Sequence, residues 1–171
     1  MSFDATLTND NSFFCATCTD KSLDEATADL NKENVDFRFF YSDPTTGGTG
    51  ASSFISADVL ATSLYPNNPP GWDNGENATA FRSVNYSSNE FDALEDESLI
   101  EGIVSGGNPV EWVNNDDGDR IGTANGANGD QDEFAQNNVF GVTFASGKHA
   151  LIRVNTLNAN NGISFDVKME N

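Results

Sequence analysis

The sequence predicts a mostly β protein, an antiparallel β-sandwich or a partly open barrel with two or three short helices. Every second residue from Ile163 to Met169 is apolar, which is the period of a strand with one buried face. Other apolar runs are short and separated by Gly-, Asn- and Ser-rich turns, which favours many short strands. Thirteen Phe residues among 171 supply the aromatic surface of a core. We therefore expect a single domain over residues 1–171.

The first elements are predicted from alternation and from helix capping. Ser2–Thr8 alternates apolar and polar residues and is expected to be a strand. Ser22 and Glu25 have the spacing of a capping box, which predicts the start of a short helix. The apolar face of this helix is expected to contain Leu23, Ala26 and Leu30.

Three further strands are predicted in the middle of the chain. Val35–Tyr41 is one, with its odd-numbered residues on one face. Phe54 and Ile55 begin a short one, after which Ser56 is expected to cap a helical turn. Ala78–Asn85 is the third.

The second half is predicted to contain a helix and then a closing meander. Ser87 and Glu90 form a second capping box, so a short helix should begin there. Val139–Phe144, His149–Val154 and the alternating segment that begins at Ile163 are separated only by short turns. Adjacent strands joined in this way pair antiparallel, so a three-stranded meander is expected.

The charge of the chain excludes several classes of partner. The formal net charge is −19, with only eight Lys and Arg residues. Such a field repels phosphate backbones and anionic lipid, so nucleic acid is not an expected partner. No apolar run reaches the ~18 residues of a membrane span. The start Met1-Ser2-Phe3-Asp4 does not resemble a signal peptide, so either the protein is cytosolic or a leader has been removed. The second alternative is preferred, and we expect an extracellular or outer-surface protein.

The two cysteines, Cys15 and Cys18, form a CxxC pair. Such a pair can be a redox motif, half of a zinc site or a short-loop disulfide. Zinc needs a second pair of ligands, and a thioredoxin-like site needs a βαβ frame, which the sequence does not predict. A local disulfide is the preferred interpretation.

An acidic segment between Asn114 and Glu133 is a candidate calcium site. Oxygen ligands on a Gly-rich loop are what Ca²⁺ selects, although the spacing is not that of an EF-hand. The alternative is a solvated acidic turn, in which Asp and Asn serve the backbone conformation. The candidate ligands are Asp116, Asp117, Asp119, Asp130, Asp132 and Glu133.

Aromatic residues in a Pro/Asn/Gly-rich segment are candidate glycan contacts. Trp72 and Tyr65 can stack on the apolar face of a sugar, while Asp73 and Asn74 can bond its hydroxyls. Trp112, between two valines, is assigned to the core instead.

No catalytic motif is found in the sequence, so we expect a protein that is not an enzyme. There is no GxSxG elbow, and the Gly-rich segment 47–50 lacks the Lys of a phosphate loop. His149, the single histidine, is interpreted as a structural hydrogen-bonding residue.

Four segments of the chain have a pattern of their own. They are Val35-Asp36-Phe37-Arg38-Phe39-Phe40-Tyr41, Asn77-Ala78-Thr79-Ala80-Phe81-Arg82 ahead of Phe91-Asp92-Ala93-Leu94, Ser146-Gly147-Lys148-His149-Ala150-Leu151-Ile152-Arg153-Val154, and Gly162-Ile163-Ser164-Phe165-Asp166-Val167-Lys168. Together they resemble a family of β-rich secreted domains and lipoproteins from Bacteroidota, largely of unknown function. The resemblance implies a surface-exposed or secreted domain, often near polysaccharide-uptake machinery. The CxxC pair and the acidic segment depart from the family pattern.

These observations lead to two hypotheses about function. The first is a non-enzymatic extracellular or cell-surface domain that binds glycan or polysaccharide and is stabilised by Ca²⁺. The second is a structural or assembly module, such as a fibre, coat or adhesin subunit, in which cations bridge acidic faces.

Overall fold

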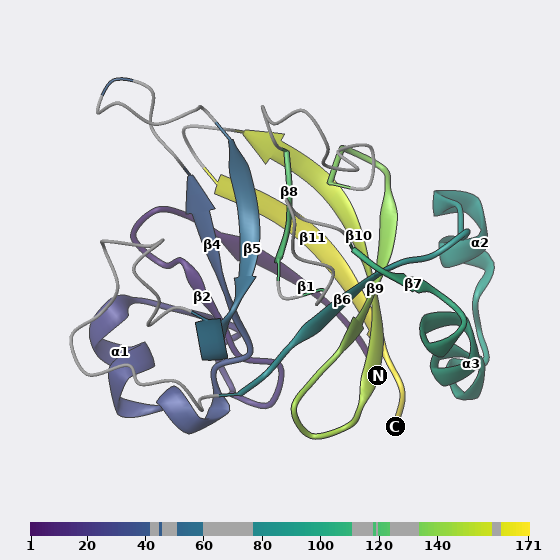
Figure 1. Cartoon of the computed structure of the whole chain (residues 1–171), viewed down its shortest axis with the longest axis horizontal. Helices are drawn as coiled ribbons and strands as arrows, with labels where there is room; N and C mark the ends of the chain where they lie inside the picture. Colours follow the sequence, from purple (N-terminus) through teal and green to yellow (C-terminus); the bar gives the residue numbers. More distant parts are fainter. Residues whose placement is uncertain are drawn as a thin grey trace.

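The computed structural model describes residues 1–41, 45, 51–59, 77–110, 118, 120–123, 134–158 and 162–171. These residues form two antiparallel sheets that pack face to face, with short helices on the outer sides (Figure 1). The prediction of a mostly β fold with few short helices is therefore confirmed, and the two separate sheets make it a β-sandwich.

The larger sheet, sheet A, has six strands among the described residues. In spatial order they are β1 (Ser2–Leu7), β11 (Gly162–Met169), β10 (His149–Asn158), β9 (Val139–Thr143), β6 (Ala80–Ser83) and β7 (Asn108–Pro109). The run β9, β10, β11 is the predicted C-terminal meander. Its register pairs Ala150 with Val142 and Arg153 with Asp166, and a bulge at Asn155 follows.

The smaller sheet, sheet B, has five strands in the described part of the chain. In spatial order they are β3 (Ser22–Leu23), β2 (Phe13–Phe14), β4 (Phe37–Tyr41), β5 (Ser52–Ser56) and β8 (Arg120–Gly122). The strands predicted at Val35–Tyr41 and at Phe54 are confirmed, although the first begins at Phe37. They are neighbours in this sheet, with Phe39 opposite Phe54.

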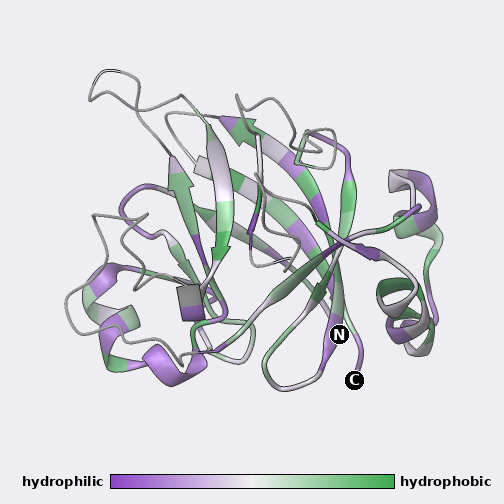
Figure 2. Ribbon diagram, viewed as in Figure 1, coloured by the Kyte–Doolittle hydropathy of each residue, from purple (hydrophilic) through white to green (hydrophobic). Residues whose placement is uncertain are grey.

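Aromatic rings fill the space between the sheets, and hydrophobic residues alternate with hydrophilic ones along several of the strands (Figure 2). Phe54 lies at the centre, with ring contacts to Phe37, Phe39, Phe81, Phe134, Phe140 and Phe165. All four apolar residues of the alternating segment in β11 lie in this core, as predicted.

Two smaller clusters attach the helices to the outer faces of the sheets. On sheet B, α1 (Glu25–Leu30) packs through Ala28 against Phe13 and Ile55. On sheet A, α2 (Ser88–Ala93) and α3 (Ile100–Ser105) pack through Phe91, Ile100 and Val104 against Val139 and Leu151. Short 3₁₀ turns complete the connections at Lys32–Asn34, Ala57–Val59 and Glu97–Leu99. No described helix is long and apolar enough to cross a membrane.

The predicted start of α1 was wrong. Asp24, rather than Ser22, caps the helix by accepting a hydrogen bond from the Thr27 N–H at 2.7 Å. Ser22 instead belongs to β3 and pairs with Phe14. The expected apolar face was also wrong, because Leu30 is 82% exposed and Ala28 is the buried residue.

Two other local predictions concerned Val35 and the capping box at Ser87, and only the second was confirmed. Val35 lies just before β4 and packs in the α1 cluster, so it does not share the inward face of Phe37 and Phe39. The second capping box is confirmed in both directions, since Ser87 accepts from the Glu90 N–H and Glu90 accepts from the Ser87 N–H. The Ser87 hydroxyl and then the Ser87 N–H donate to the Glu90 carboxylate, and these two hydrogen bonds lower the pKa of Glu90.

Candidate functional site

The predicted ligand-binding residues lie outside the part of the chain that the structure describes. Tyr65, Trp72, Asp73 and Asn74 fall in one undescribed segment, and Trp112 falls in another. The same holds for the candidate calcium ligands Asp116, Asp117, Asp119, Asp130, Asp132 and Glu133. Within the described residues there is no group of three or more His, Cys, Asp or Glu that could hold a metal. The glycan platform and the calcium site therefore stay predictions.

A groove of about 560 Å³ is the strongest candidate site among the described residues. It lies where β6 ends, between the segment that leads into α2 and the segment that follows α3. Residues 83–86, 103 and 106–108 line it. All eight of these residues are uncharged, although the chain carries 27 acidic residues. The groove is therefore a neutral surface on a strongly anionic protein.

The groove is lined by one aromatic residue, Tyr86, and by several polar side chains. Tyr86 is partly buried against the α2–α3 cluster, and Asn85, Asn108 and Ser83 lie along the same groove. Burial, followed by the nearby Glu90 carboxylate, raises the pKa of Tyr86, so its hydroxyl stays protonated and neutral. Two amides and a serine hydroxyl, together with a phenol, suit a ligand with many hydroxyl groups and no charge.

A close backbone approach forms the floor of the groove. A Cβ at Gly107 would lie 2.5 Å from the Ser83 carbonyl oxygen and 3.0 Å from Val84 Cγ1, so this position needs glycine. The Gly107 N–H donates to the Val104 carbonyl oxygen at 3.0 Å, which fixes the turn after α3. This groove was not predicted from the sequence. The Gly106-Gly107 pair beside Asn108 was the available signal, but its contact with β6 is a tertiary one.

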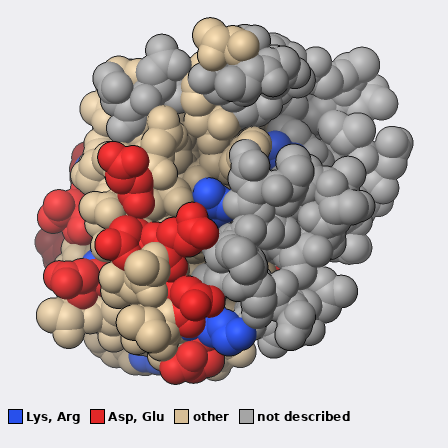
Figure 3. Space-filling model, turned by 90° about the vertical axis from the view of Figure 1, so that its left-hand side faces the viewer, with Lys and Arg blue, Asp and Glu red and all other residues tan. Residues whose placement is uncertain are grey.

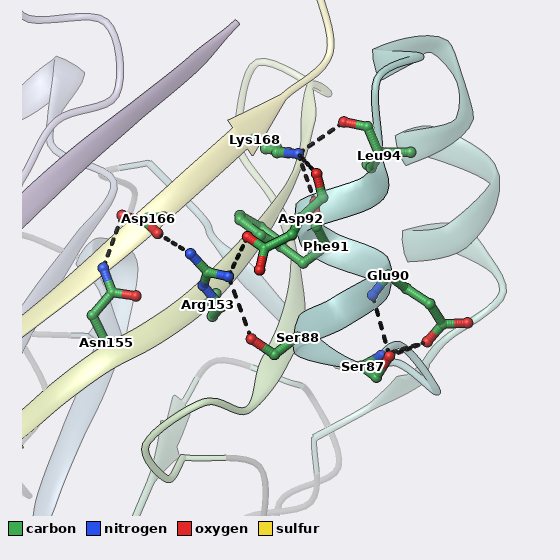
Figure 4. A network of polar contacts seen from close by, with 10 residues as sticks. All are labelled: Ser87, Ser88, Glu90, Phe91, Asp92, Leu94, Arg153, Asn155, Asp166 and Lys168. Atoms are coloured by element: carbon green, nitrogen blue, oxygen red, sulfur yellow. Dashed lines mark hydrogen bonds and ion pairs between the residues drawn. The ribbon is translucent and has the colours of Figure 1, made fainter.

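The side of the groove that carries Tyr86 is held in place by α2, which begins at Ser88, two residues after Tyr86. Arg153 on β10 donates to Asp92 and Ser88 of α2 and to Asp166 of β11 (Figure 4). Burial disfavours the charge on Arg153, but the hydrogen bonds and charges of Asp166 and Asp92 outweigh it and raise its pKa. The guanidinium also lies 4.8 Å from the centroid of the Phe91 ring, a cation–π distance.

The opposite end of α2 is held by a second cation. Lys168 Nζ donates to the carbonyl oxygens of Phe91 at 2.5 Å and Leu94 at 2.8 Å (Figure 4). Carbonyls at a helix C-terminus lack helical partners and favour positive charge, so Lys168 satisfies both needs. Lys168 and Arg153 therefore fix the helix, and with it the Tyr86 side of the groove, from the outer face of sheet A.

Acidic side chains gather on the face that carries α1 (Figure 3). The exposed carboxylates of α1 and of the segments next to it in the chain are Asp20, Asp24, Glu25, Asp29 and Glu33. A separate acidic depression of about 470 Å³ is lined by Glu95, Asp96, Glu97, Glu101 and Glu170. There Glu170 accepts a hydrogen bond from the His149 N–H at 2.7 Å, and its Oε1 lies 3.1 Å from His149 Nδ1. The interpretation of His149 as a structural residue agrees with these contacts.

Cys15 and Cys18 form the local disulfide that was predicted, with an S–S distance of 1.98 Å. The loop that holds it follows β2, and Cys15 is fully buried while Cys18 is partly exposed. The Cys18 N–H donates to Cys15 Sγ at 3.1 Å, and Thr17 Oγ1 lies 3.6 Å from the same sulfur.

Two charged residues, Lys21 and Asp36, fasten this loop. Lys21 Nζ donates to the Ala16 carbonyl oxygen at 2.7 Å and to the Cys18 carbonyl oxygen at 2.6 Å. Asp36 Oδ2 accepts from the Ala16 N–H at 2.7 Å. Asp36 is almost completely buried, and burial raises its pKa to about 6 against the opposing hydrogen bond from Ala16 and the charge of Lys21.

The fold is similar to that of a DUF4466 family protein from Parabacteroides merdae, known from a crystal structure, with a TM-score of 0.61 and 15% sequence identity. The alignment covers 99% of this chain and 53% of that chain, so this chain spans about half of its length. At such low identity the likeness shows the fold alone. Parabacteroides belongs to Bacteroidota, which agrees with the resemblance found in the sequence. No family model matches the sequence, and no curated protein matches it.

Proposed function

We propose that this chain is a non-enzymatic binding domain, extracellular or at the cell surface, that takes a neutral glycan in the groove beside Tyr86. The observation that carries the proposal is the uncharged lining of this groove in a chain of net charge −19. This lining has no charged side chain that could form an ion pair with a charged ligand. A sugar ring can stack on the phenol and exchange hydrogen bonds with the amides of Asn85 and Asn108.

The rigidity of the groove supports the same proposal. The capping box and the Arg153 and Lys168 contacts hold the Tyr86 side, and the Gly107 approach holds the floor. A preformed site avoids the entropy cost of ordering side chains on binding, which matters for weak ligands such as sugars. Tyr65 and Trp72, with Asp73 and Asn74, are proposed as a second aromatic contact for a longer chain, and a calcium ion in the acidic segment as a stabilising element.

A glycan array followed by calorimetric titration tests the proposal. Wild type is expected to bind one or more neutral oligosaccharides, and Y86A should weaken binding at least tenfold. Y86F keeps the ring and should retain most of the affinity if stacking dominates. L99A, which removes an exposed apolar side chain outside the groove, is the matched control. If no neutral glycan binds, or if Y86A and N108A bind as wild type does, the groove is not a glycan site.

A structural or assembly role is the second candidate, favoured by the acidic face that carries α1 (Figure 3). Five exposed carboxylates there would repel a second copy until a divalent cation lies between them. Sedimentation with and without Ca²⁺ separates this role from glycan binding. Calcium-dependent assembly that is lost in D24N/E25Q/D29N supports it, whereas a monomer at every calcium concentration contradicts it.

A further inference from the structure

We propose that the Cys15–Cys18 pair is a site of reversible thiol–disulfide exchange, in which an external dithiol attacks Cys18 and Cys15 is the leaving sulfur. This activity is independent of glycan binding. The proposal follows from the unequal exposure of Cys15 and Cys18 and from the hydrogen bonds around the loop that holds them.

The two sulfurs differ in access and in surroundings. Cys18 is partly exposed, although it packs against the α1 cluster, whereas Cys15 is fully buried, so Cys18 is the more accessible of the two to an incoming thiolate. The Cys18 N–H already donates to Cys15 Sγ at 3.1 Å, and the Thr17 hydroxyl lies 3.6 Å from it. A leaving thiolate on Cys15 would keep the N–H donor and could gain the hydroxyl as a second one. Hydrogen-bond donors stabilise a thiolate relative to its thiol and make it a better leaving group, which here offsets the burial of Cys15.

Lys21 adds positive charge to the same loop. Its Nζ is held by the carbonyl oxygens of Ala16 and Cys18, and it lies 5.0 Å from the centroid of the Phe3 ring. Because both hydrogen bonds are to the backbone, the ammonium group stays at the loop whether or not the sulfurs are joined. A cation held at the loop favours the thiolate form over the thiol and opposes the negative charge of Asp36, which accepts from the Ala16 N–H.

The loop keeps its shape through contacts that do not involve the S–S bond. The Cys15 N–H donates to the Lys21 carbonyl oxygen at 3.1 Å, and the Ala16 N–H donates to Asp36 at 2.7 Å. The disulfide joins residues only three apart, so it removes little entropy from the unfolded chain. Reduction is therefore expected to open the bond without unfolding the domain.

The thiol–disulfide exchange takes place in two steps that conserve electrons and protons. A thiolate of the dithiol attacks Cys18 Sγ, the Cys15–Cys18 bond breaks, and its electron pair goes to Cys15 Sγ. The second thiol of the reagent, as its thiolate, then attacks the reagent's own sulfur in the mixed disulfide and releases Cys18 as a thiolate. The dithiol becomes a cyclic disulfide, and the protein gains two electrons and two protons as two thiols. An oxidised partner runs the same steps in reverse.

The charge near the loop selects among reductants. Asp20 lies within the loop and Asp24 follows it, and both are exposed. An anionic thiol is repelled there, so the preferred reductant is a neutral or cationic dithiol. Dithiothreitol is the neutral probe, and glutathione is the anionic one.

The test uses the full chain under native conditions. The wild-type protein is treated with dithiothreitol, and the reaction is quenched with N-ethylmaleimide. Intact-protein mass spectrometry counts the alkylated cysteines, and near-UV circular dichroism monitors folding. We expect both cysteines to be alkylated with the folded signal retained. The dithiothreitol rate constant should exceed that for glutathione at least tenfold at low salt, after correction for thiolate concentration, and the ratio should fall as salt is added.

Peptide mapping and two lysine variants complete the test. A mixed disulfide with the monothiol 2-mercaptoethanol should be found on Cys18, and not on Cys15. K21M should slow exchange about tenfold, with rescue by K21R, while the control K148M in an exposed turn leaves the rate unchanged. The proposal is overturned if the disulfide is reduced only when the protein unfolds, or if the mixed disulfide is found on Cys15. Peptide mapping of the wild-type protein distinguishes these outcomes even if K21M does not fold.

Discussion

The rings of Phe54 and Phe165 meet edge to face across the space between the two sheets, with their centroids 5.3 Å apart. Phe54 belongs to β5 in sheet B and Phe165 to β11 in sheet A, so this pair joins the two layers directly. Both rings are completely buried. Since Phe54 also contacts Phe37 at 4.6 Å and Phe134 at 4.9 Å, it connects much of the aromatic core.

Truncation of Phe54 is therefore expected to be severe. F54A should lower the free energy of unfolding by about 3–5 kcal/mol, because it removes a buried ring and leaves a cavity between the sheets. Urea unfolding measures the loss. L30A, at an exposed apolar side chain on α1, is the control and should change stability by less than about 0.5 kcal/mol. Equal effects of the two substitutions would contradict the assigned core.

Arg153 is expected to stabilise the attachment of α2 to sheet A. R153A removes the donors to Asp92 and Asp166, and should cost about 1–3 kcal/mol because the arginine side chain is only 17% exposed. Amide hydrogen exchange should show faster opening of Ser88–Ala93 than of β10. K148A removes an exposed lysine in the turn after β9 and should leave both measurements unchanged.

Gly162 is expected to tolerate no side chain. Its φ is +111°, and a Cβ there would lie 2.0 Å from the Leu7 carbonyl oxygen, so β1 would have to move away from β11. Gly147 has a φ of +81° with nothing within 4 Å of the added Cβ. G147A should therefore show only the conformational cost of about 1 kcal/mol, and G162A should cost at least twice as much. Thermal unfolding compares them, and similar losses would refute the close approach.

The buried carboxyl of Asp36 should make stability depend on pH. Its pKa is raised to about 6, above the ordinary value of 3.8, so the folded state binds this proton more tightly than the unfolded state does. The contribution of this group is fully present below about pH 4 and falls by about 3 kcal/mol as pH rises through about 6. In D36N this component should disappear.

The readout for Asp36 is the difference between wild type and D36N in unfolding free energy at several pH values. That difference is expected to change between about pH 4 and pH 7 and to be flat above this window. Other titrating groups are common to both proteins and cancel. A difference that stays constant through the window would mean that Asp36 is ionised in both states.

Calcium is expected to stabilise the protein if the acidic segment binds it. An ion that binds only the folded state raises the unfolding free energy by about 2.7 kcal/mol at a hundredfold excess over Kd. Thermal unfolding with Ca²⁺ and with EDTA measures this shift, and D130N/D132N should abolish it. Melting temperatures that are equal in the two conditions remove calcium from the proposed function.

The elements that the sequence predicted well are those in which local pattern and tertiary structure agree. Alternation in β11 and the capping box at Ser87 needed no distant information. The start of α1 was mispredicted because Ser22 and Asp24 are both good capping residues, and the choice depends on pairing between Ser22 and Phe14. The position of Val35 likewise depends on α1, which packs over the outer face of sheet B.

The groove beside Tyr86, unlike the fold, was not predicted from the sequence. The groove beside Tyr86 depends on the approach of Gly107 to β6, a contact between residues more than twenty positions apart. Pattern reasoning instead selected conspicuous loop residues such as Trp72, which stand in the undescribed part of the chain. The CxxC pair was correctly predicted as a disulfide, but the buried Asp36 beside its loop has no sequence signature.

The two chain ends lie next to each other (Figure 1). The Met1 amino group donates to the Met169 carbonyl oxygen at 2.6 Å and to Asn171 Oδ1 at 3.3 Å. A few glycines would suffice to join them, and new ends could be cut at the open turn around Gly147. The molecule is thus suited to circular permutation, and to grafting into a surface loop of a carrier protein without stretching the host backbone.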